Sequence, residues 1–246
     1  GQVGINRSVS VFSVPDFHIS GLRVNTTEVS DTSAKVSIDM SLASFSGKGR
    51  KRVPVSIDVT DPSGKQVYGF NEKFIPDSIC LDQDFILGSP QLWTAETPDL
   101  YTLTIKINNK VAESIKFGVR EVIVNKEKLL LNGKPIKLRG VNHHDSDPYH
   151  GKVISRESLI KDMEMMKEAN MNFIRCSHYP KSPEFYDLCD SMGFYVMDEI
   201  PFGFGEEHLK DPDYLEVLIN RAHATLIRDW NHPSVIIWSV GNENEL

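Results

Sequence analysis

The sequence predicts two parts of different fold class, a β-sandwich followed by a parallel α/β domain. In residues 17–119 apolar and polar side chains alternate along short segments, as they do at Val36, Ile38 and Met40. Such alternation over about a hundred residues predicts the antiparallel strands of an immunoglobulin-like sandwich. From about residue 121 short apolar strands alternate with segments of helical spacing, which predicts a parallel sheet.

The strands of the sandwich are separated by residues that favour turns. Apolar alternation marks residues 53–59 and 103–107, and residues 61–64 (DPSG) lie between these strands. Pro presets one φ angle and Gly accepts a positive one, so this segment is typical of a tight turn. Asn108 and Asn109 mark another turn.

The α/β part contains four strand patterns, at residues 136–141, 173–176, 194–197 and 235–240. Ser155 is placed to cap the first helix, and Pro183 to lie in the first turn of the second, which Gly193 would end. Pro212 opens a third helix whose predicted apolar face consists of Leu215, Leu218, Ile219, Ala222 and Leu226. This alternation fits an open doubly wound sheet as well as a barrel. Residues 140–143 (GVNH) lack the G-x-G-x-x-G spacing, which disfavours nucleotide binding.

Composition excludes several classes of protein. Apolar residues make up 40% of the 246-residue chain and charged residues 25%, as in ordinary globular proteins. The net charge of -7 argues against nucleic acid or an anionic membrane surface as a partner. The N-terminus has neither an initiator Met nor a signal peptide, so we expect an internal fragment, with both cytoplasmic and secreted locations open.

Polar and ionisable side chains follow all four predicted strands. They are Asn142, His143, His144, Asp145 and Asp147 after the first, Arg175, Ser177, His178 and Tyr179 after the second, Asp198 and Glu199 after the third, and Asn242 and Glu243 after the fourth. In a barrel all four strand ends would meet at the face that carries catalytic groups. Glu243 directly follows an apolar strand and is the first candidate for catalysis.

Two long segments resemble the signature segments of glycoside hydrolase family 2: residues 172–180 (NFIRCSHYP) and 230–243 (WNHPSVIIWSVGNE). Residues 139–144 (RGVNHH) and 117–120 (FGVR) resemble the opening of its catalytic barrel. The resemblance implies that residues 120–246 form the first four β/α units of a TIM (β/α)8 barrel. It also implies an immunoglobulin-like domain at 16–119 and the tail of an upstream jelly-roll sugar-binding domain at 1–15.

The resemblance implies a retaining exo-β-glycosidase in which Glu243 is the general acid/base. Asn242 would contact the sugar 2-hydroxyl, His144 and His178 would face the sugar, and Arg175 would orient the nucleophile. A general acid must hold its proton at neutral pH, so the pKa of Glu243 must be raised; we expect burial beside Trp238 and a second carboxylate nearby to raise it. The resemblance implies that Asp198 and Glu199 support the site, and structural pairing with Arg175 or Arg139 is the alternative.

Two departures from the family pattern limit the resemblance. The nucleophile is a glutamate on a later barrel strand, so we expect this fragment to be inactive alone. Residues 200–205 (IPFGFG) offer no counterpart of the loop ligands of magnesium-dependent β-galactosidases. The resemblance thus implies no cofactor, with dependence on magnesium left open.

Several alternatives stay open from the sequence. A β-galactosidase is favoured, with a β-glucuronidase of the same family as the alternative and a non-catalytic carbohydrate-contacting or assembly fragment as a third. Residues 143–147 (HHDSD) suggest a metal centre, but adjacent histidines on a strand point to opposite faces. The expected partners are a carbohydrate substrate and a second copy of the chain, because half a barrel exposes apolar strand edges.

Overall fold

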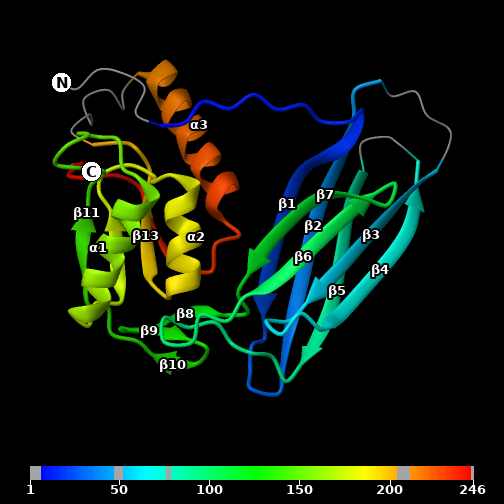
Figure 1. Cartoon of the computed structure of the whole chain (residues 1–246), viewed down its shortest axis with the longest axis horizontal. Helices are drawn as coiled ribbons and strands as arrows, with labels where there is room; N and C mark the ends of the chain where they lie inside the picture. Colours follow the sequence, from blue (N-terminus) through cyan, green and yellow to red (C-terminus); the bar gives the residue numbers. More distant parts are fainter. Residues whose placement is uncertain (1–6, 47–51, 76–78, 204–210, 245–246) are drawn as a thin grey trace. The chain divides into compact units, whose positions relative to one another are not determined.

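The computed structural model describes residues 7–46, 52–75, 79–203 and 211–244 (Figure 1). Contacts divide the chain into two compact units, Ser10–Ile136 and a second unit that combines Gly1–Val9 with Lys137–Leu246. Among the described residues, no helix is both long enough and apolar enough to cross a membrane.

The first unit is the predicted sandwich of two antiparallel sheets. One sheet has the order β1 (Phe17–Thr27), β2 (Ser33–Ser44) and β5 (Ile79–Gly88). The other has the order β4 (Gln66–Phe74), β3 (Val53–Thr60), β6 (Tyr101–Ile107) and β7 (Lys110–Phe117). The immunoglobulin-like class predicted from the sequence is confirmed.

The core of the sandwich is formed by the alternating residues that predicted its strands. Val36 and Ile38 of β2 and Ile57 of β3 are fully buried. Removing such side chains from water stabilises the fold by roughly 1.5–3 kcal/mol each. The turn after β6 places both Asn108 and Asn109 at positive φ, which asparagine tolerates better than most residues.

A small antiparallel sheet follows the sandwich. It consists of β8 (Val122–Asn125), β9 (Lys128–Leu131) and β10 (Lys134–Pro135), and it belongs to the sandwich unit by its contacts. The strand predicted at 136–141 therefore begins later than expected, because the Ile136 N–H still bonds to Leu129 of this sheet. The placement of residues 1–15 in an upstream domain stays a prediction.

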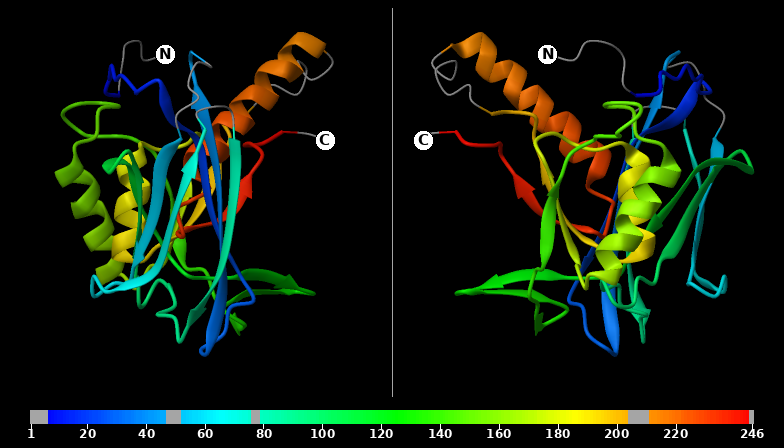
Figure 2. Two further views of the ribbon diagram at one scale, coloured as in Figure 1. Left: turned by 90° about the vertical axis from the view of Figure 1, so that its right-hand side faces the viewer. Right: turned by 60° about the vertical axis from the view of Figure 1, so that its left-hand side comes forward.

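The second unit alternates strands and helices along one parallel sheet. Its elements are β11 (Gly140–His143), α1 (Arg156–Glu168), β12 (Phe173–Cys176), α2 (Pro183–Met192), β13 (Tyr195–Glu199), α3 (Pro212–Asp229) and β14 (Val235–Ser239). The four strands pair in chain order without reversal (Figure 2). A doubly wound sheet reverses its order at a switch point, so this order is that of the first strands of a barrel.

Local signals place the helix ends as predicted. The Ser158 N–H donates to Ser155 Oγ at 3.1 Å, and Gly193 ends α2 in the left-handed conformation at φ 78°. Gly140 allows β11 to approach β12, since a Cβ there would lie 1.8 Å from the carbonyl oxygen of Phe173. The core between helices and sheet includes Leu159, Met163, Phe185, Ile174 and Val196.

Helix α3 packs less completely than its apolar spacing predicts. Leu218 is buried as expected, but Leu215 is 44% exposed and Ile219 59% exposed. On β14, Trp238 is 37% exposed. Among the described strands β14 is an edge strand with a neighbour on one side only, so this part of the α/β unit leaves apolar surface uncovered.

Candidate active site

The alternation of side chains along β12 and β13 separates a helix-facing set from an opposite set. Ile174 and Val196 pack with the helices, so Arg175 and Glu199 lie on the other face of the sheet. Both residues are at the carboxyl ends of their strands. In a barrel this is the inner face at the end where catalytic groups collect.

Glu199 lies at the centre of a hydrogen-bonded cluster. Its side chain is fully buried, and its Oε2 accepts from Arg175 Nη2 at 2.7 Å, Arg175 Nε at 2.9 Å and Ser239 Oγ at 2.8 Å. Its Oε1 lies 3.0 Å from His178 Nδ1. The carboxylate thus joins the end of β12, the loop after it, and the end of β14.

Asn242 is attached to the same cluster through Arg175. Arg175 Nη2 donates to Asn242 Oδ1 at 2.9 Å, and the Asn242 side chain is almost buried. The backbone N–H of Asn242 donates to the Phe202 carbonyl at 2.8 Å, which holds the segment after β14 beside that after β13. Three of the predicted site residues, Arg175, His178 and Asn242, are therefore brought together.

His144 joins this group by ring contact, whereas His143 does not. The His144 ring lies perpendicular to that of His178 with centroids 5.0 Å apart. Burial, reinforced by Lys181, lowers the pKa of His144, which favours a neutral ring. His143 Nε2 lies 3.3 Å from Asp162 on α1, so the adjacent histidines take opposite faces, as the strand period requires. This geometry gives no support to a metal site shared by the pair.

Glu243 lies in a different setting from its neighbour Asn242. It is exposed at φ 49°, and it lines an open, mainly apolar hollow together with Phe202, Leu218 and Val240. The expectation that Glu243 is buried beside Trp238 is therefore wrong for this chain. The physical reason is its position beside β14, the edge strand, where no further element of the described chain covers it.

The sequence did not predict the buried ion pair between Lys181 and Asp145. Lys181 is fully buried, and its Nζ lies 3.2 Å from Asp145 Oδ1, while Arg7 Nη2 donates to Asp145 Oδ2 at 3.0 Å. Burial lowers the pKa of Lys181, and the Asp145 carboxylate opposes that shift. These ion pairs hold the loop that carries His178. In the sequence, only the position of Lys181 directly after the segment 172–180 could have indicated a role for this residue.

Asp198 and Glu199 turn out to have separate surroundings. Asp198 faces the helices, where the Tyr186 hydroxyl donates to its Oδ1 at 2.6 Å. Burial raises the pKa of Asp198 to about 7; the Tyr186 bond opposes the shift and the neighbouring Asp229 carboxylate adds to it. Of the two readings of this pair, Glu199 fits pairing with Arg175, and Asp198 belongs to the interior behind the sheet.

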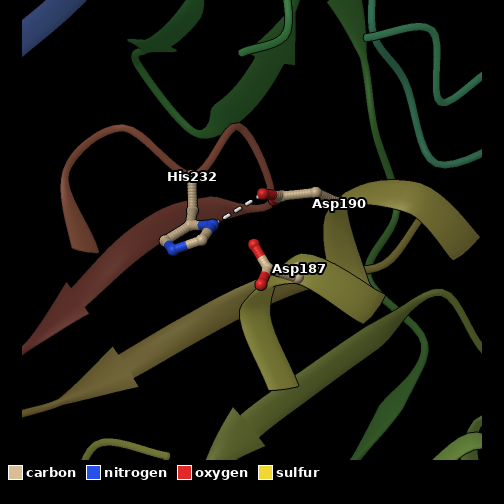
Figure 3. Close-up of side chains that lie close together, drawn as sticks. All are labelled: Asp187, Asp190 and His232. Carbon is tan, nitrogen blue, oxygen red and sulfur yellow. Dashed lines mark hydrogen bonds and ion pairs between the residues drawn. The ribbon is translucent and has the colours of Figure 1, made fainter. Parts of the chain in front are cut away.

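A second polar group, Asp187, Asp190 and His232, lies at the end of α2 (Figure 3). His232 Nδ1 lies 2.6 Å from Asp190 Oδ2, and the Ser234 N–H donates to Asp190 Oδ1 at 3.0 Å. Although burial opposes protonation, the Asp190 bond raises the pKa of His232. Since both Asp190 oxygens already have protein donors, this group is a structural tie between α2 and the turn before β14.

Comparison with known proteins places both units in one family. Residues 17–120 match the family described as glycosyl hydrolases family 2, and residues 122–246 match its TIM barrel domain. A β-galactosidase of Lactococcus lactis subsp. lactis (strain IL1403) is 40% identical over an alignment of 187 residues, and the match covers 71% of this chain and 18% of that protein. The chain thus spans about a fifth of the length of this relative.

Two solved structures show the same fold. A glycosyl hydrolase family 2 member from Bacteroides cellulosilyticus DSM 14838 superposes with a TM-score of 0.83 at 27% identity, covering 93% of this chain and 32% of that one. A β-glucuronidase from Ruminococcus gnavus, in complex with C6-substituted uronic isofagomine, has a TM-score of 0.81 at 30% identity. That match covers 95% of this chain and 38% of the β-glucuronidase.

Proposed function

The chain belongs to glycosyl hydrolases family 2, and on this premise we propose that it supplies the acid/base half of the active site of a retaining exo-β-glycosidase. The observation that carries the proposal is the Arg175–Glu199–Asn242 cluster at the carboxyl ends of β12, β13 and β14. A preorganised set of donors and acceptors at this end of a barrel suits the recognition of sugar hydroxyls.

In the proposed mechanism Glu243 protonates the departing glycosidic oxygen and then takes a proton from the attacking water. The nucleophile is a second carboxylate outside these 246 residues, at the separation of roughly 5–5.5 Å that retaining enzymes use. The remaining barrel would cover the apolar hollow beside Glu243 and exclude water from it. Asn242 contacts the sugar 2-hydroxyl, and Arg175 orients the nucleophile.

His144 and His178 complete the sugar-binding edge in this proposal. Their rings are in contact, and a neutral His144 can exchange hydrogen bonds with hydroxyl groups. We propose no cofactor and leave dependence on magnesium open, because residues 200–205 (IPFGFG) do not match the loop ligands of magnesium-dependent β-galactosidases. Residues 204 and 205 of this segment lie outside the described residues.

The sugar that we propose is a terminal β-linked galactose. The 40% identity to the Lactococcus lactis β-galactosidase supports it, and the 30% identity to the Ruminococcus gnavus β-glucuronidase supports glucuronic acid as the alternative. The test is to assay the complete enzyme against a panel of nitrophenyl β-glycosides. We expect the galactoside to be hydrolysed fastest; preference for the glucuronide would select the alternative.

The 246-residue chain by itself is expected to be inactive. A double displacement needs both carboxyl groups, and we propose that this chain carries one of them. Hydrolysis by the purified chain above that of its Glu243→Ala variant would contradict the division of the site. Absence of hydrolysis by the complete enzyme on every glycoside tested would favour a non-catalytic carbohydrate-contacting or assembly role.

A further inference from the structure

We propose that Glu199 is a positioning residue that sets the direction of hydrogen bonding at the sugar-binding edge. It holds His178 in the tautomer with the proton on Nδ1, and through Arg175 it holds Asn242 with its amide nitrogen away from the guanidinium. This inference rests on the proposed sugar site and concerns which of its atoms donate and which accept.

The tautomer of His178 follows from what Glu199 can and cannot do. A carboxylate that receives both Arg175 donors on one oxygen is an acceptor only, and it has no hydrogen to offer His178. His178 Nδ1, 3.0 Å from Oε1, must then be the donor. A neutral imidazole carries one ring proton, so Nε2 keeps its lone pair as an acceptor.

One rival arrangement exists at the same nitrogen. Arg175 Nη2 lies 3.3 Å from His178 Nδ1 and would donate to it if the ring proton were on Nε2. That arrangement leaves Oε1 of the fully buried Glu199 without this donor. Leaving a buried acceptor unsatisfied costs about 1–3 kcal/mol, and Nη2 already has Glu199 and Asn242 as acceptors. The Nδ1–H tautomer is therefore the better satisfied one.

The orientation of Asn242 follows from Arg175 in the same way. A guanidinium only donates, so the Asn242 atom 2.9 Å from Arg175 Nη2 is the amide oxygen. The amide nitrogen then lies on the other side of the group, where it has no acceptor among the described residues. Because Glu199 binds Arg175 through both Nε and Nη2, the guanidinium cannot rotate without breaking the ion pair.

The proposed sugar-binding site therefore offers one acceptor, His178 Nε2, and one donor, Asn242 Nδ2. A sugar hydroxyl can serve either, because it both donates and accepts. The hydroxyl that meets His178 must carry its hydrogen, so an O-methyl or deoxy sugar at that position loses this bond. The site therefore selects a sugar with a free hydroxyl there.

The first test measures the tautomer directly in the 246-residue chain. The protein contains eight histidines, so histidine-selective 15N labelling with a His178→Gln variant assigns the signals of His178. At a pH where the ring is neutral, we expect the proton on Nδ1. A proton on Nε2 would overturn the proposal. This measurement needs no substrate, so its outcome is separate from that of the glycosidase assay.

A Glu199→Gln variant should reverse the tautomer. Three donors face the Oε2 side, so the amide oxygen of Gln belongs there and its NH2 group must face His178. His178 Nδ1 would then accept, and the ring proton would move to Nε2. The matched control is Ser239→Ala, which removes one donor to Oε2 and should leave His178 unchanged.

Failure of Glu199→Gln to fold would leave the wild-type tautomer as the deciding measurement. A folded Glu199→Gln protein that keeps the Nδ1 proton would contradict the proposal. Glu184→Gln controls for the loss of an arginine-paired glutamate, since Glu184 forms an exposed ion pair with Arg156 at 3.1 Å. We expect no effect of that change on His178.

The complete enzyme provides a second readout. Misplacing the site groups should lower kcat/KM of Glu199→Gln by about 100-fold on the natural sugar. The loss should be smaller on the deoxy sugar that cannot donate to His178, and Glu199→Asp should recover part of the activity. An equal loss on both sugars would indicate a merely structural role for Glu199.

Discussion

The sandwich and the α/β unit differ in where they keep their polar groups. Among the described residues, the buried polar and charged side chains all lie in the α/β unit, from His143 to Asn242, and none lies in the sandwich. The sandwich buries two apolar sheet faces against each other. The α/β unit buries one face against its helices and carries the Glu199 cluster at the ends of its strands. The sandwich interior is thus apolar, whereas the α/β interior includes polar networks whose burial costs desolvation free energy.

The largest expected effect is on catalysis, in the α/β unit of the complete enzyme. Glu243→Gln should slow glycosylation by substrates with poor leaving groups by about 10²–10⁴-fold, because their oxygen needs a proton. Activated aryl glycosides should lose much less in that step. Pre-steady-state kinetics would measure both, and thermal melting of the 246-residue chain should be unchanged by the substitution because Glu243 is exposed in that chain. Equal losses on both kinds of substrate would remove Glu243 from the acid/base role.

The sandwich should respond to a core substitution in stability alone. Ile38→Ala leaves a cavity at a fully buried position and should cost about 2–5 kcal/mol in the free energy of unfolding. Ile86→Ala is the matched control, since Ile86 lies on the neighbouring strand β5 and is 65% exposed. Hydrogen exchange followed by mass spectrometry would report each unit separately. A loss of protection that appears equally in both units would show that they do not behave independently.

The uncovered apolar surface of the α/β unit should cause self-association of the isolated chain. Ile219 of α3 exposes an apolar side chain, and among the described strands β14 has a neighbour on one side only. Light scattering at tens of micromolar should detect dimers or larger species, and Ile219→Glu should shift the distribution towards monomer. A stable wild-type monomer with a cooperative melt would contradict this prediction.

A smaller effect is expected on the pH dependence of stability, which should differ between the two units. The folded pKa of Asp198, raised to about 7, lies above its ordinary value of 3.8, so this group stabilises the α/β unit fully below pH 4. That contribution is lost as the pH rises through about 7, and Asp198→Asn should abolish the dependence. In the sandwich, hydrogen bonds from Ser46 lower the pKa of Asp16, so its contribution is lost in acid instead. Hydrogen exchange at pH 5 and pH 8 would measure the Asp198 contribution, and hydrogen exchange below pH 4 would measure the Asp16 contribution. Stability of the α/β unit that rises between pH 5 and pH 8 would refute the assignment.

Most of the elements could be predicted because their signals are local. The period-two spacing of Val36, Ile38 and Met40 requires only that one face of a strand be buried, and all three are. Ser155 and Gly193 act within a single helical turn, so they mark helix ends in any tertiary context. The strand predicted at 136–141 begins later, at Gly140, because the Ile136 N–H bonds to Leu129 of β9. No local pattern in the sequence indicates this bond.

The sequence by itself determined the two fold classes, the helix ends and the position of the polar groups at the ends of the strands. The tertiary structure decided which of these groups meet. Glu199 and not Asp198 pairs with Arg175 because register and side-chain alternation place them on one face of the sheet. The burial of Lys181 and the exposure of Glu243 depend on which elements cover each residue, and such coverage joins residues far apart in the chain.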